Sequence, residues 1–194
     1  MTTLVKAPKI DPNPATISDG PITTRPTTSA DLAVISALHA RTFGPGRFAR
    51  TAYRLREQAR SPLVSPHCRT ARDSSSQLAG AVTMTAITIG DSSGHWLLGP
   101  LAVSPSLAGK GLGRRLVAEA LASVAARGAA TAVVVLVGDT KYYCPIGFVP
   151  VRAGSVLLPG PVDPARILAW LGPDVTRAAP EGLIRADLDA TERP

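Results

Sequence analysis

Apolar side chains recur at helical spacing in three parts of the chain. In residues 31–43 they fall three to five positions apart, between a Thr-Ser-Ala-Asp capping signal and a Gly-Pro-Gly stop. Residues 47–58 repeat this spacing with basic side chains on the other face. Residues 113–127 show the strongest pattern, followed by a glycine suited to end a helix. The sequence therefore predicts three amphipathic helices.

Between the second and third helices the pattern changes to runs typical of strands. We expect strands at residues 67–73, 78–89 and 95–103, the last two joined by a Gly-Asp-Ser-Ser-Gly hairpin loop. Gly99 and Pro100 interrupt the third strand, and because proline has no N–H to donate, we expect a bulge, a splay or an edge there. Residues 131–137 are apolar throughout, which is typical of a strand buried on both faces.

The order of these elements predicts a single α/β (α+β) domain. The strand–helix–strand unit that ends at residue 137 should be parallel and right-handed, whereas the earlier strands should form an antiparallel meander. We therefore expect a mixed, mostly antiparallel twisted sheet with a central parallel strand pair and flanking helices. In the tail we expect an apolar segment at residues 156–158, a short helix at 163–170 and a last strand at 182–188.

The N-terminal segment differs in composition from the rest of the chain. Residues 1–26 are rich in proline and threonine with scattered aliphatic side chains, which predicts a disordered leader. We place the leader at residues 1–22 and the domain at residues 23–190. The segment lacks the apolar stretch of a secretory signal, and no apolar run in the chain approaches the roughly 20 residues that span a bilayer. These features predict a cytoplasmic protein with no membrane partner.

The charge of the chain limits the classes of ligand. Its formal net charge is +7, but no run of lysine or arginine exceeds two residues and no nucleic-acid recognition motif is present. We therefore expect no nucleic-acid partner, and a basic DNA-binding domain is the weaker alternative. The three histidines are too far apart in sequence to form a metal-binding pair, and there is no CxxC. The sequence predicts no metal site.

The strongest chemical signal lies in the loop before the third helix. Gly109, Gly111 and Gly113 alternate there, with Lys110 and Arg114 beside them. Glycines let the backbone turn tightly and bring its N–H groups to an anion, and the helix N-terminus adds unpaired N–H groups. The segment lacks both the GxxxxGK[ST] P-loop and the GxGxxG dinucleotide fingerprint. It predicts a phosphate cradle, with a glycine turn that only caps the helix as the alternative.

This loop resembles motif A of the GNAT superfamily of N-acetyltransferases, whose core reads [QR]xxGx[GA]. The chain reads Ala-Gly-Lys-Gly-Leu-Gly from Ala108 to Gly113, with Ala108 where Gln or Arg is usual. A second segment, KYYCPIGF, is similar to the [LF]YxxxGF segment of the family, with Tyr143 four residues before Gly147. Residues 44–57 and 158–169 look like segments of a bacterial subgroup of uncharacterised predicted acetyltransferases.

The resemblance implies a GNAT-like domain that uses acetyl-CoA as co-substrate and no metal. It implies that the pantetheine arm lies between the strands at residues 95–103 and 131–137. It implies that the coenzyme is bound by Leu101, Ala102, Val103, Ala108, Gly109, Lys110, Gly111, Leu112, Gly113 and Arg114.

The resemblance also implies that Tyr143 is the general acid that reprotonates the departing CoA thiolate. A core aromatic is the alternative for Tyr143, and we interpret Tyr142 as a packing residue. His95, at a strand start, is a candidate base, with a surface histidine as the alternative. The implied activity is acetyl transfer by direct attack of a primary amine, on a small molecule or a peptide. A non-catalytic CoA-binding module of the same fold stays open as an alternative, and so does a homodimer.

Overall fold

The computed structural model describes residues 20–46, 51–58, 64–127, 131–173, 175 and 180–190. Its helices are α1 (Leu32–Phe43), α2 (Thr51–Gln58), α3 (Leu112–Ala126) and the one-turn α4 (Thr140–Tyr143). The first three confirm the helical patterns, although residues 47–50 of the second pattern lie outside the described residues. The capping signal forms a short 3-10 turn, Ser29–Asp31, that leads into α1.

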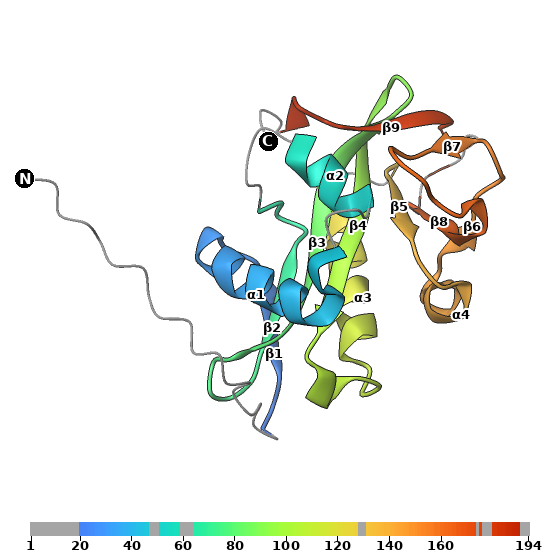
Figure 1. Cartoon of the computed structure of the whole chain (residues 1–194). Helices are drawn as coiled ribbons and strands as arrows, with labels where there is room; N and C mark the ends of the chain where they lie inside the picture. Colours follow the sequence, from blue (N-terminus) through green and yellow to red (C-terminus); the bar gives the residue numbers. More distant parts are fainter. Residues whose placement is uncertain are drawn as a thin grey trace, which may run out of the picture.

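Nine strands form the sheet of the described chain (Figure 1). They are β1 (Thr23–Pro26), β2 (Arg69–Arg72), β3 (Leu78–Ile89), β4 (Ser92–Val103), β5 (Val133–Val137), β6 (Val149–Pro150), β7 (Val156–Leu157), β8 (Ile167–Leu171) and β9 (Gly182–Ala186). The main order is β1-β2-β3-β4-β5-β8-β6, and β9 pairs with both β3 and β7. All pairs on the main path are antiparallel except the central β4–β5 pair, which confirms the expected fold class.

The helices cover the sheet from both faces. α3 contacts β2, β3 and β4, and α1 and α2 contact β3 and β4. Leu116 of α3 joins one core cluster and Leu55 of α2 joins the other, so the two helices pack on opposite faces. Neighbouring β4 residues point to opposite faces of the sheet: Leu97 packs in the cluster that contains α2, and Leu98 packs in the cluster that contains α3.

The interruption at Gly99 and Pro100 produces both a bulge and a splay. The β3–β4 register shifts between Val82 and Met84, opposite this dipeptide. On its other edge β4 pairs with β5 only as far as Leu97, after which it continues to Val103 with β3 as its only neighbour among the described strands. A gap between β4 and β5 therefore opens beside the last six residues of β4.

The helix expected at residues 163–170 is wrong. Residues 164–166 form a 3-10 turn, and β8 follows and pairs with β5. Ile167 and Ala169 pack in one core cluster and Leu168 in the other, so both faces of β8 are buried. A strand with two apolar faces shows no alternation of polar and apolar residues, and the sequence pattern alone does not distinguish it from a buried helix.

The proline- and threonine-rich composition noted for residues 1–26 extends four residues into the domain, because residues 23–26 form β1 and pair with β2. A buried carboxylate fastens this edge: Asp31 is 1% exposed and pairs with Arg25 at 2.8 Å and with Arg72 at 2.6 Å. Burial alone would raise the pKa of Asp31, but the hydrogen bonds from the two arginines outweigh it and lower the pKa well below its usual range. Residues 1–19 lie outside the described part of the chain.

Candidate active site

The loop between β4 and α3 has the backbone geometry of an anion cradle. A 3-10 turn, Pro105–Leu107, follows β4, and α3 begins after Gly111. Gly109 and Gly111 have φ angles of +76° and +82°, in the left-handed region that other residues rarely adopt. A Cβ at either position would meet no atom within 4 Å, so these glycines leave open space in front of the backbone.

Several amides of this loop are free to bind a ligand. In the described chain the N–H groups of Ala108 and Lys110 donate to carbonyls within the loop, to Pro105 at 3.2 Å and to Leu107 at 3.3 Å. Within the described residues no backbone carbonyl accepts a hydrogen bond from the amides of Gly109, Gly111, Leu112, Gly113 and Arg114. The last three lie in the first turn of α3, where the positive end of the helix dipole adds to their attraction for an anion.

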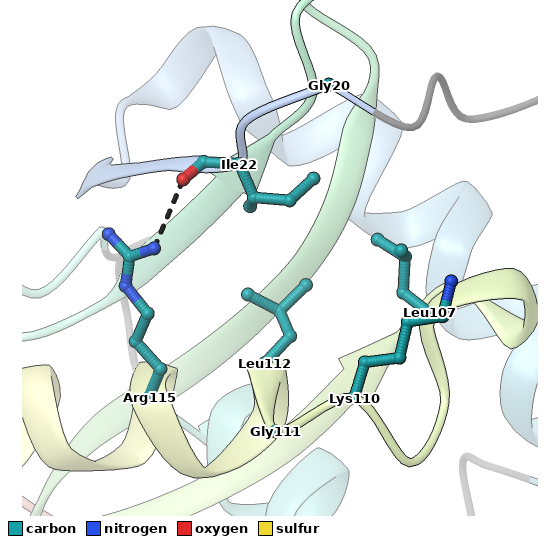
Figure 2. A pocket seen from close by; sticks show the side chains of 7 residues that line it. All are labelled: Gly20, Ile22, Leu107, Lys110, Gly111, Leu112 and Arg115. Atoms are coloured by element: carbon teal, nitrogen blue, oxygen red, sulfur yellow. Dashed lines mark hydrogen bonds between the residues drawn. The ribbon is translucent and has the colours of Figure 1, made fainter.

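A cavity of about 410 Å³ adjoins the cradle on its β1 side (Figure 2). Ile22, Leu107 and Leu112 line it with apolar atoms, and Lys110 and Arg115 place cationic side chains at its edge. Arg115 donates to the carbonyl of Ile22 at 3.1 Å, which ties the segment before β1 to α3. Ile22 lies in the segment predicted as a leader, so no sequence pattern marks it as part of this wall.

The gap between β4 and β5 begins where the cradle ends. Leu101 and Val103 are half-buried and face the side of the sheet that α3 covers, and Ala102 between them is buried and pairs with Ala81 of β3. The structure thus brings the residues predicted to line the pantetheine path next to the loop predicted to hold the diphosphate.

Tyr143 lies at the far side of this gap, at the end of α4. Its ring stands edge-on to Phe148, with centroids 5.7 Å apart, and its ring atoms lie against the backbone of Gly138, where β5 ends. Phe148 is 1% exposed, which anchors the turn that follows α4. Burial raises the pKa of Tyr143 to about 12, and the neighbouring Tyr142 adds to the shift. The hydroxyl therefore keeps its proton at neutral pH.

Tyr142 was interpreted as a packing residue, and the structure gives it a more specific position. Its hydroxyl oxygen contacts Gly113 in the first turn of α3, so closely that a Cβ there would collide with it. The guanidinium of Arg114 lies 5.8 Å from the centre of the Tyr142 ring. The adjacent tyrosines were the only available signal, and no local pattern says which of them crosses to α3.

The structure removes His95 as a candidate base. His95 is 5% exposed, so the expectation of a surface histidine is also wrong. Its Nδ1 accepts a hydrogen bond from the amide of Val133 at 3.1 Å, and its Nε2 lies 2.9 Å from the hydroxyl of Ser92. Both nitrogens are occupied by structural contacts near the start of β4, whereas the cradle follows the end of that strand.

The comparison with protein families decides the assignment. The family model described as Acetyltransferase (GNAT) family matches residues 33–143, more than half of the chain. The chain belongs to the GNAT acetyltransferase family. The matched region of this GNAT domain runs from α1 to Tyr143 and includes the β4–α3 loop.

Solved structures agree with this assignment. The GNAT domain is similar to the GNAT family N-acetyltransferase YhbS of Escherichia coli, determined in complex with CoA, with a TM-score of 0.71 and 25% identity over 95% of this chain and 97% of that one. A GNAT family acetyltransferase of Brucella melitensis, in complex with acetyl-CoA, has the same fold, with a TM-score of 0.61 and 22% identity over 86% and 96% of the two chains. A search of curated proteins finds no match.

No described helix has the length and apolar character that crossing a membrane requires. No group of three or more His, Cys, Asp or Glu side chains among the described residues could hold a metal ion.

Proposed function

We propose that this GNAT protein transfers the acetyl group of acetyl-CoA to a primary amine of a small molecule or peptide. The observation that carries the proposal is the junction of two features: a loop with unpaired backbone amides at the start of α3, and a gap between β4 and β5 that begins beside it. Together they suit a long ligand with an anionic part and an extended arm. The complex of the similar YhbS with CoA supports this choice of ligand.

The residues of the cradle fit the diphosphate of CoA. There is open space beside the backbone at Gly109 and Gly111, and the side chains of Lys110 and Arg114 are exposed next to them. Hydrogen bonds to a charged group contribute roughly 1.5–3 kcal/mol each, so a few amides are enough to hold the anion. Ala108 in place of the usual Gln or Arg leaves these backbone donors unchanged. The same binding orients the arm along Leu101, Ala102 and Val103.

Acetyl-CoA supplies an activated thioester, and the chain supplies orientation and a proton. The free edge of β4 offers backbone N–H groups that could stabilise negative charge on the thioester oxygen while the amine attacks. We assign the general acid to Tyr143, because its ring is fixed against Gly138 where β5 ends and its phenol keeps its proton at neutral pH. The amine nitrogen forms the bond to the acetyl carbon and gives up a proton to solvent, the carbon–sulfur bond breaks, and Tyr143 donates its proton to the leaving thiolate. Solvent then reprotonates the tyrosinate.

A thiol-release assay with acetyl-CoA and a library of amines tests the proposal. Turnover on at least one amine is expected, and binding of CoA without any turnover would favour the non-catalytic module instead. Tyr143→Phe keeps the ring and removes the hydroxyl, and we expect kcat to fall by about 10²–10⁴ while CoA still binds. Unchanged kcat in Tyr143→Phe would remove this residue from the mechanism without affecting the assignment of the cradle.

A further inference from the structure

Tyr142 joins the two sides of the gap at the point where the cradle meets it. The side chain starts from α4, which follows β5, and its hydroxyl ends against Gly113 of α3. A methyl group built on Gly113 would lie 3.6 Å from the side chains of both Leu101 and Val103, so the end of β4 is also close by. The phenol therefore spans from the β5 side of the gap to the β4 side.

The hydroxyl of Tyr142 is available to a ligand. The hydroxyl makes no hydrogen bond to any described residue. Its oxygen is not fully buried, so it keeps contact with solvent. Burial of the ring raises the pKa of Tyr142, with Arg114 opposing the shift. The group keeps its proton at neutral pH and can act as a donor.

Two contacts hold the ring in place. The guanidinium of Arg114 lies 5.8 Å from the ring centre, within the range of a cation–π interaction. On its other flank the ring of Tyr143 lies 4.8 Å away, at 75° to it. A phenol fixed in this way against Gly113 adds a side-chain donor to the first turn of α3.

We propose that Tyr142 is a positioning residue for the co-substrate: its hydroxyl donates a hydrogen bond to the anion that the first turn of α3 holds, at the entrance to the gap. The inference rests on the proposed function, which identifies this anion as the diphosphate of CoA. It also explains the third glycine of the loop. Gly113 has no side chain because the Tyr142 hydroxyl occupies the space that a Cβ would need.

Titration of the protein with CoA by calorimetry tests the role directly. Tyr142→Phe removes only the oxygen, and its Kd for CoA should rise about tenfold or more, the effect of losing one hydrogen bond to a charged group. Tyr143→Phe is the matched control, because the same atom is removed one residue further along, and it should bind CoA like the wild type. In turnover, Tyr142→Phe should raise KM for acetyl-CoA with kcat unchanged, whereas Tyr143→Phe should lower kcat.

A double-mutant cycle tests the contact itself, without reference to activity. Gly113→Ala places a methyl group against the Tyr142 hydroxyl and should lower the urea midpoint of unfolding and weaken CoA binding. Both losses should become smaller when Gly113→Ala is made in the Tyr142→Phe protein, because the oxygen that the methyl group meets is then missing. Fully additive effects would show that the contact does not exist.

The outcomes separate this inference from the function on which it rests. A wild-type protein that does not bind CoA would overturn both. Equal Kd values for the wild type and Tyr142→Phe would overturn only the positioning role. A Tyr142→Phe protein with lower kcat and unchanged KM would also overturn it, because the hydroxyl would then act on the chemical step.

Discussion

Gly111 is the position at which a single side chain should test the anion cradle most directly. Its φ of +82° lies in the left-handed region, and a Cβ added there meets nothing within 4 Å. Replacing Gly111 with Asp or Asn therefore causes no collision inside the protein, and the left-handed conformation costs about 1 kcal/mol in either variant. Both residues also suit the N-cap of a helix, so the two variants should have similar stability.

The two variants differ only in charge, and the size of that effect can be calculated. A carboxylate about 5 Å from one negative charge of the diphosphate, at an effective dielectric constant of about 20, costs about 3 kcal/mol. This corresponds to a Kd for CoA more than about a hundredfold higher in Gly111→Asp than in Gly111→Asn. Because the position is exposed, the ratio should fall as salt is added, since the Debye length shrinks to about 3 Å at 1 M.

Calorimetric titration with CoA at low and high salt measures this ratio. A thermal melt of each variant verifies that both fold. Equal Kd values for the Asp and Asn proteins at low salt would refute the cradle, because no anion could then lie near Gly111. A large ratio that does not depend on salt would refute the electrostatic reasoning, because an exposed charge interaction should be screened.

Two further predictions concern stability. Asp31→Asn removes the charge that pairs with Arg25 and Arg72, and we expect a loss of about 2–3 kcal/mol by urea denaturation, less than for a fully buried pair because both arginines keep contact with water; a loss below about 1 kcal/mol would contradict this role. Burial lowers the pKa of His67 to about 4, with Arg127 and Arg69 adding to the shift, so the unfolded chain binds a proton first as the pH falls. Stability should therefore drop by roughly 3 kcal/mol between about pH 6.5 and pH 4, and His67→Gln should lose this dependence on pH.

The pattern of apolar residues predicted most helices and strands because these elements each bury one face. α1 and α3 start and end within two residues of the predicted bounds, since their apolar stripes and end signals are local. β8 was missed because both of its faces are buried between neighbours that are distant in sequence. β1 was missed for a related reason: three polar residues and a proline become a strand only when β2 is beside them.

The candidate site also combines features that the sequence predicted with features that depend on contacts between distant segments. The alternating glycines predicted a turn with open backbone, and Gly109 and Gly111 have the positive φ angles that such a turn requires, because these are properties of a short segment. Which of the two tyrosines crosses to α3 depends on how β5 and α4 are placed relative to β4, and no neighbouring residue carries that information. For His95 the sequence predicted exposure, because the residue lies near the start of a strand. In the structure its ring is buried and accepts a hydrogen bond from the amide of Val133 in β5.

The sequence by itself determined the elements with one buried face, the glycine loop of the cradle and the resemblance to the family, because each depends on residues that are close together along the chain. The tertiary structure alone decided that β8 pairs with β5, that β1 closes the edge of the sheet, and that the Tyr142 hydroxyl meets Gly113. These features are contacts between segments far apart in sequence. Their geometry is set by the packing of the sheet and its helices, which no local pattern of side chains specifies.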